Sequence, residues 1–245
     1  MTSLSRELLY NVHSLNTIPQ FREFCYNKIK ENDMRLLPLI YIFIFGVVLT
    51  AALLFLNLPF WLIYVVIIVV YVVLLVLPQM YTIYKSNNLK KIERFLEKNK
   101  QKPIFAYPLA VKNGDREEII SSIQLILSKY KQPYMQEVYK TNLALYENNV
   151  SPFEQRAKQI SKEPLHTYYI AYAEARKGNF EEAHSLKGKL PVGWMPYAID
   201  AIIALEKGDL SGFRIATEQC IHLASGIQKF NLFYSFEWME KEYAN

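Results

Sequence analysis

One stretch of the chain has no charged residue, and it restricts the fold more than any other feature. No Asp, Glu, Lys, Arg or His occurs in the 49 residues from Leu36 to Tyr84, although Arg35 and Lys85 flank them directly. Because about 20 apolar residues cross a bilayer as a helix, the stretch has room for two crossings. A soluble hairpin would need a polar outer face, which these residues lack. The sequence therefore predicts a transmembrane hairpin over residues 36–84.

A turn divides the charge-free stretch into two spans. The turn, Asn57-Leu58-Pro59, combines a residue common in turns with a proline that suits the start of a helix. We therefore predict spans over residues 36–56 and 60–81. Gly46 and Thr50 stand four residues apart on the first span, so they permit another helix to approach closely. That helix is either the second span of this chain or a helix of a partner.

The positive charge of the chain lies beside the predicted membrane segment. Of the net charge of +5, residues 85–102 supply seven Lys or Arg against two Glu, whereas residues 103–245 have sixteen against seventeen acidic residues. Basic flanks remain on the cytoplasmic side of a membrane, and the turn between the spans has no charge. We therefore predict a multi-pass protein of the cell membrane with both termini in the cytoplasm.

Residues 85–102 predict a basic juxtamembrane helix. Lys and Arg at this position attract the anionic headgroups of the cytoplasmic leaflet. A nucleic-acid-binding protein would more often carry its basic residues as a stripe on the folded domain, so we expect no nucleic-acid partner. The residues predicted to face lipid headgroups are Lys85, Lys90, Lys91, Arg94 and Lys98.

The residues before the first span predict a separate cytoplasmic helical segment, 1–35. Its apolar residues recur at helical spacing at Leu4, Leu8, Val12 and Leu15. The pattern leaves two placements open. The segment either lies on the membrane surface or packs on the soluble domain.

The remaining residues, 103–245, predict an all-α cytoplasmic domain of repeated helical hairpins. No stretch alternates between apolar and polar residues as a half-buried strand would. Four segments each end one helix, place Gly or Asn at a turn and begin another helix. The turn residues are Gly114, Asn148, Gly178 and Gly208, at spacings of 34, 30 and 30 residues. Periods of this length are typical of stacked helical hairpins.

One of these turns resembles a known repeat family. The segment Gly178-Asn179-Phe180-Glu181-Glu182-Ala183 is similar to the turn motif Gly-Asp-aromatic-acid-Glu-Ala of tetratricopeptide repeats. Ile170 and Ala171 match the apolar and small positions of the preceding helix, whereas Glu174 stands where the family has a tyrosine. The resemblance implies a tetratricopeptide-like α-hairpin repeat domain and the general tendency of that family to bind other proteins.

The resemblance also implies a binding strip on the concave face, which the first helix of each hairpin lines. Tyr168, Tyr172 and Arg176 lie on one helical stripe at spacings of four residues, and Asn142 and Tyr146 of the preceding hairpin would lie beside them. Tyrosine and arginine are common anchors of interfaces. Alternatively, the two tyrosines of the stripe pack between hairpins and Arg176 caps a helix end.

Aromatic residues near the C-terminus predict a helix that covers the last hairpin. Aromatic side chains at helical spacing belong more often to a core than to a ligand site, so we expect packing residues here. They are Phe230, Phe233, Tyr234 and Trp238.

No pattern in the sequence predicts catalysis, a cofactor or a metal site. Glycine-rich nucleotide loops and nucleophile elbows are missing. Cys25 and Cys220 stand far apart, which favours two reduced thiols over a disulfide or a zinc site. The four histidines also lack the spacing of metal ligands. These residues are His13, His166, His184 and His222.

These features predict a binding protein and not an enzyme. The first hypothesis is a membrane-anchored scaffold or adaptor whose helical-repeat domain docks a protein partner. The alternative is an accessory or regulatory subunit of a larger membrane complex, such as a transporter. A third reading is an organiser of the lipid surface that acts through the basic residues of 85–102.

Overall fold

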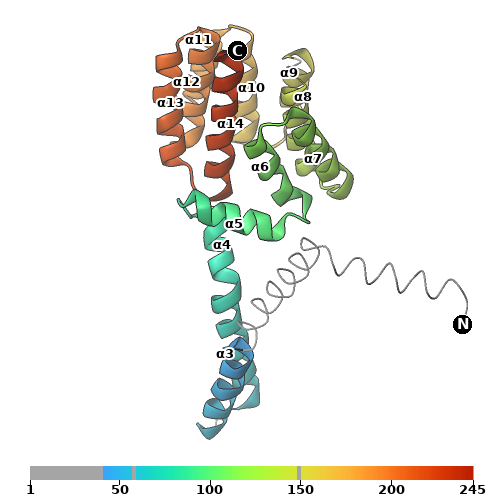
Figure 1. Cartoon of the computed structure of the whole chain (residues 1–245), viewed down its shortest axis with the longest axis vertical. Coiled ribbons are helices and arrows are strands. Elements are labelled where there is room, and N and C mark those ends of the chain that lie inside the picture. The colour runs from blue at the N-terminus through green and yellow to red at the C-terminus, as the bar shows by residue number, and fades with distance from the viewer. Residues whose placement is uncertain (1–40, 57–58, 148–149, 245) are drawn as a thin grey trace, which may run out of the picture. The chain divides into compact units, whose positions relative to one another are not determined.

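The computed structural model describes residues 41–56, 59–147 and 150–244 (Figure 1), and every regular element in these ranges is a helix. The predicted segment 1–35 and the turn residue Asn148 lie outside the described residues. The chain divides into two compact units, Met1–Leu75 and Val76–Asn245. The helices in chain order are Tyr41–Phe55, α3 (Phe60–Tyr71), the π-helical turn η1 (Val72–Val76), α4 (Leu77–Tyr84), α5 (Leu89–Asn99), α6 (Pro103–Asn113), α7 (Arg116–Lys129), α8 (Pro133–Tyr146), α9 (Val150–Ala157), α10 (Leu165–Arg176), α11 (Phe180–Lys187), α12 (Trp194–Glu206), α13 (Leu210–Leu223) and α14 (Gly226–Ala244).

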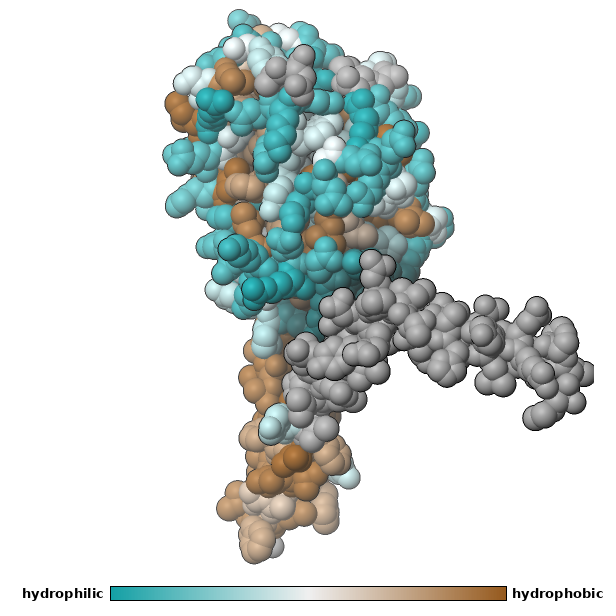
Figure 2. Space-filling view, in the orientation of Figure 1, coloured by the Kyte–Doolittle hydropathy of each residue, from teal (hydrophilic) through white to brown (hydrophobic). Residues whose placement is uncertain are grey.

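One helix of the described chain is long and apolar enough to cross a membrane. It runs without a break over the 25 residues Phe60–Tyr84, three residues past the predicted end at residue 81. The most apolar stretch of this helix has a mean hydropathy of 3.2. At 1.5 Å per residue it is about 38 Å long, which exceeds the roughly 30 Å of a hydrocarbon core. Only 6% of that stretch is buried, and Figure 2 shows hydrophobic residues covering this part of the surface.

A π-helical turn within this helix has a local cause. Pro78 has no N–H to donate to the carbonyl four residues earlier, and its ring would clash with that carbonyl in a regular α-helix. The wider turn Val72–Val76, directly before α4, accommodates the proline without ending the helix.

Within the described residues, a second and shorter apolar helix, Tyr41–Phe55, packs beside α3, and residues 36–40 of the predicted first span lie outside that range. Gly46 is buried at this contact, where a Cβ atom would lie 2.5 Å from the hydroxyl of Tyr71. The hydroxyl of Thr50 donates to the carbonyl of Gly46 over 2.7 Å, so the small residues of this face lie together. Gly46 therefore contacts the second helix of the same chain.

In the second unit, most helices form antiparallel pairs in chain order. The pairs are α6 with α7, α8 with α9, α10 with α11 and α12 with α13, and each pair contacts the next. The predicted turn residues Gly114, Gly178 and Gly208 have φ angles of 74°, 81° and 75°. Because L side chains rarely adopt this left-handed region, glycine makes these tight turns at little cost.

The last helix, α14, joins the two ends of this array instead of covering only the last pair. It contacts α13 at one end and α4, α5 and α6 at the other (Figure 1). Phe230 of α14 is fully buried with Ile92 and Leu96 of α5, whereas Phe236 packs into the larger core of α8 to α13.

The start of α14 is hydrogen-bonded to the end of α4. The hydroxyl of Ser225 donates to the carbonyl of Tyr84 over 2.7 Å, and the N–H of Gly226 donates to the carbonyl of Ser86 over 2.8 Å. These bonds satisfy carbonyl groups that have no partner within a helix end. Gly226 has a φ of 60°, and a Cβ atom there would overlap the carbonyl oxygen of Ile83. Only glycine fits at this contact.

Candidate functional site

The structure brings the residues of the predicted binding strip together around two neighbouring cavities of the second unit. Tyr168, Tyr172 and Arg176 lie on α10, and Asn142 and Tyr146 lie on α8. Tyr168 and Tyr172 are only 8% and 4% exposed. They therefore belong to the interior between helices, as in the alternative reading of the sequence, and their role in partner binding remains a prediction.

The first cavity, which we call the inner cavity, lies between α14 and the helices α8 and α10. Its volume is about 340 Å³, and Asn142, Tyr146, Tyr168 and Tyr172 all line it. Seven tyrosines and Trp194 contribute to its wall, and none of the lining residues carries a charge. The α14 side supplies polar groups from Gln228, Asn231 and Ser235.

The second cavity, the outer cavity, has a volume of about 450 Å³ and a charged lining. Arg176 pairs with Glu206 of α12, with 3.0 Å between Nε and Oε1. Arg116 of α7 donates from its Nε to the carbonyl oxygen of Tyr146 over 2.8 Å. Tyr146 and Tyr172 line both cavities, so the two spaces share a wall.

The tyrosines of the inner cavity are uncharged at neutral pH. Burial raises the pKa of Tyr139 to about 12, and it also raises the pKa of Tyr168, Tyr169 and Tyr172 above the ordinary value. Burial disfavours the charged form of an acid, which is the cause of these shifts. Each side chain therefore keeps its hydroxyl proton, so the wall of the cavity carries no phenolate charge.

Most polar atoms between these helices have partners, but two lack them. The hydroxyl of Tyr169 donates to Oδ1 of Asn142 over 2.7 Å. In contrast, the buried Oη of Tyr172 and Oδ1 of Asn231 have no hydrogen-bond partner within the described structure. The guanidinium of Arg176 lies close enough to Tyr172 for its positive charge to oppose the effect of burial on the pKa of that side chain.

The predicted lipid-facing residues lie at the exposed side of the juxtamembrane segment. Helix α5, Leu89–Asn99, is shorter than the predicted segment 85–102 and buries Ile92 and Leu96 on its other face. Lys91 also lies over the ring of Tyr81, with Nζ 5.4 Å from the ring centroid. The exposed basic residues are Lys85, Lys90, Lys91, Arg94 and Lys98.

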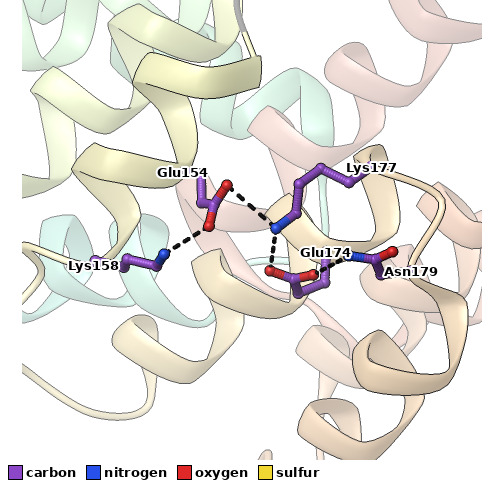
Figure 3. A network of polar contacts seen from close by, with 5 residues as sticks. All are labelled: Glu154, Lys158, Glu174, Lys177 and Asn179. Atoms are coloured by element: carbon purple, nitrogen blue, oxygen red, sulfur yellow. Dashed lines mark hydrogen bonds and ion pairs between the residues drawn. The ribbon is translucent and has the colours of Figure 1, made fainter.

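Glu174, where the sequence departs from the tetratricopeptide motif, belongs to a polar network between α9 and α10 (Figure 3). Lys177 places its Nζ 2.6 Å from Glu174 and 3.2 Å from Glu154, and Lys158 lies 2.6 Å from the other oxygen of Glu154. The amide of Asn179 donates to Glu174 over 2.7 Å. The pKa of Glu154 is lowered by its hydrogen bonds with Lys158 and Lys177. The network links two neighbouring helical pairs, a contact that the sequence did not indicate.

Comparison with protein families, with curated proteins and with solved structures gives no match to this chain. Within the described ranges, no group of three or more His, Cys, Asp or Glu could hold a metal ion. His166 instead lies 2.8 Å from the carbonyl oxygen of Ile160 through its Nδ1. Cys220 is fully buried, and burial raises the pKa of its thiol to about 12. His13 and Cys25 lie outside the described residues.

Proposed function

We propose that this chain is a membrane-anchored scaffold or adaptor whose cytoplasmic helical domain docks a protein partner. The observation that carries the proposal is the exposed, apolar helix Phe60–Tyr84 in a chain whose second unit consists of paired helices. An apolar surface of this size would be costly in water but suits a bilayer. In this proposal the chain combines an anchor with a domain that contains the uncharged inner cavity and the charged outer cavity.

The anchor in this proposal is a hairpin of two spans with both termini in the cytoplasm. Its support is the charge-free sequence 36–84 and the packing of Tyr41–Phe55 beside α3 at Gly46. Small residues allow membrane helices to approach closely, which favours a paired arrangement. The basic residues of α5 would then lie next to the anionic headgroups of the cytoplasmic leaflet.

The domain in this proposal is a tetratricopeptide-like array whose inner side is filled by its own helix α14. Its support is the regular pairing of helices and the left-handed glycines at three of the predicted turns. Because Tyr168 and Tyr172 are buried, a partner would reach the domain at the outer cavity. Arg176, Glu206 and Tyr243 line that cavity, and Tyr243 is 50% exposed.

The test places a photoreactive amino acid at Tyr243 of the full-length chain in cells. The matched control places it at Ile215 on α13, which is 63% exposed and does not line the outer cavity. We expect one defined protein to cross-link at Tyr243 but not at Ile215. The full chain is required, because a fragment of residues 103–245 would remove α4 and α5 from α14. Equal cross-linking at both positions would contradict docking at this cavity.

A pair of charge variants separates docking from folding in the same assay. Arg176→Glu breaks the ion pair with Glu206, whereas Arg176→Glu combined with Glu206→Arg restores a pair of reversed polarity. We expect the double variant to recover the melting temperature but not the cross-link at Tyr243. Recovery of both would show that the ion pair serves stability alone. Gentle extraction and sizing address the alternative, since an accessory subunit would elute in a much larger particle.

A further inference from the structure

We propose that the inner cavity binds an uncharged small molecule that carries an aromatic or heteroaromatic ring and at least one N–H or O–H donor. This site goes beyond the docking of a protein, and neither depends on the other. Three properties of the cavity lead to this class of ligand: its size and neutrality, its aromatic wall and its two unpartnered polar atoms.

The size and charge of the cavity favour a neutral organic molecule. Its volume of about 340 Å³ falls within the range of roughly 300–1,000 Å³ that is usual for ligand pockets. All of its lining residues are uncharged. Apart from the Arg176 guanidinium beside Tyr172, a charged ligand would meet no charged side chain at this lining, so it would lose its hydration with little compensation. The outer cavity, in contrast, offers both signs of charge.

The wall of the cavity suits a ring. Tyr168 lies edge-to-face with Trp194, with 5.3 Å between their ring centroids, and edge-to-face with Tyr169 at 5.2 Å. Aromatic rings attract one another in such arrangements because the edge of one ring is positive and the face of the other is negative. A planar guest can continue this pattern, whereas a flexible aliphatic chain cannot.

The two unpartnered atoms define the polar groups of the ligand. Oδ1 of Asn231 is a carbonyl oxygen, which only accepts, so the ligand must supply a donor. The hydroxyl of Tyr172 can donate or accept, and this side chain is 4% exposed. Asn231 lies on α14 and Tyr172 on α10, so one molecule that bonds to both atoms would bridge the two helices.

The experiment uses indole and three related probes. 1-Methylindole lacks the N–H donor, indole-3-acetate adds a negative charge and tryptamine adds a positive charge. The full-length chain in detergent is titrated with each probe by calorimetry, and empty micelles correct for partition. We expect saturable binding of indole and about tenfold weaker binding of 1-methylindole, which lacks the N–H donor. We expect no binding of indole-3-acetate or tryptamine, which carry a charge at neutral pH.

Three variants locate the site. Asn231→Leu removes the acceptor and should abolish the difference between indole and 1-methylindole. Tyr172→Phe removes only the buried oxygen and should weaken indole binding several-fold at an unchanged or higher melting temperature, because an unpartnered hydroxyl is lost. Tyr197→Phe on α12, which does not line the cavity, should bind indole like the unaltered chain.

The proposal is overturned if indole does not bind saturably, since the cavity then holds only water. Binding of the charged probes as tight as that of indole would also overturn it. Indole binding that is unchanged in both Asn231→Leu and Tyr172→Phe would place the probe elsewhere and contradict the assignment. If Asn231→Leu does not fold, the comparison of indole binding between Tyr172→Phe and the control Tyr197→Phe decides.

Discussion

At the scale of single residues, Gly226 is the most constrained glycine of the described part of the chain. Its φ of 60° disfavours any side chain, and the carbonyl oxygen of Ile83 occupies the space that a Cβ atom would need. Gly178 provides a matched comparison, because it has a φ of 81° but no atom within 4 Å of a Cβ. The two glycines thus separate the cost of a left-handed backbone from the cost of a steric clash.

We predict that Gly178→Ala lowers the free energy of unfolding by about 1–2 kcal/mol, the cost of a left-handed residue with a Cβ. Gly226→Ala should cost clearly more, because the clash with a carbonyl also separates the start of α14 from the end of α4. Thermal or chemical unfolding of the full-length chain in detergent, followed by circular dichroism, measures both. Equal losses would show that this contact does not contribute to stability.

At the scale of elements, α5 has two different faces. Ile92 and Leu96 are buried against Phe230 and Leu109, whereas the basic side chains are exposed. The acidic residues of the helix are engaged in ion pairs, Glu93 with Lys112 and Glu97 with Lys100. A free peptide of this segment would expose its apolar face, so its lipid binding has to be measured in the intact chain.

We predict that exchanging four basic residues of α5 for glutamine reduces the anionic lipid retained by the detergent-solubilised chain. Each Lys or Arg near a membrane surface contributes about 1 kcal/mol, and high salt should remove the difference. Mass spectrometry of the bound lipid measures it. The altered residues are Lys90, Lys91, Arg94 and Lys98, and the control exchanges the exposed residues Lys129, Lys131, Lys140 and Lys189. An equal loss of lipid in the control would assign the effect to net charge alone.

At the scale of the whole molecule, the topology can be read from single cysteines. Cys220 can stay in place, because it is fully buried and its thiol pKa of about 12 leaves almost no reactive thiolate at neutral pH. Cys25 is exchanged for serine. New cysteines replace Asn57 in the predicted outer turn and Ser121, an exposed residue of α7.

We predict that a membrane-impermeant maleimide labels Asn57→Cys in intact cells, and labels Ser121→Cys only after the membrane is opened. The reason is the uncharged turn between two basic flanks, which places the flanks in the cytoplasm. Labelling of Ser121→Cys from outside would reverse the proposed orientation. Labelling of both positions in intact cells would contradict a hairpin.

The sequence alone determined the features that depend on neighbouring residues. The charge-free run predicted apolar helices, of which one in the described chain is long enough to cross a membrane. Glycine at positions 114, 178 and 208 predicted the helix-ending turns, because this signal acts within a few residues.

Only the tertiary structure decided where α14 lies and whether the residues of the predicted binding strip are buried or exposed. Periodicity shows which residues are apolar, but it does not show which distant segment covers them. The aromatic residues of α14 suited a cap on the last hairpin, yet Phe230 packs against α5. Tyr172 and Asn231 are far apart in the chain, and only the packing of α14 against the array places both at one cavity. Their lack of partners follows from this long-range packing, which no local pattern encodes.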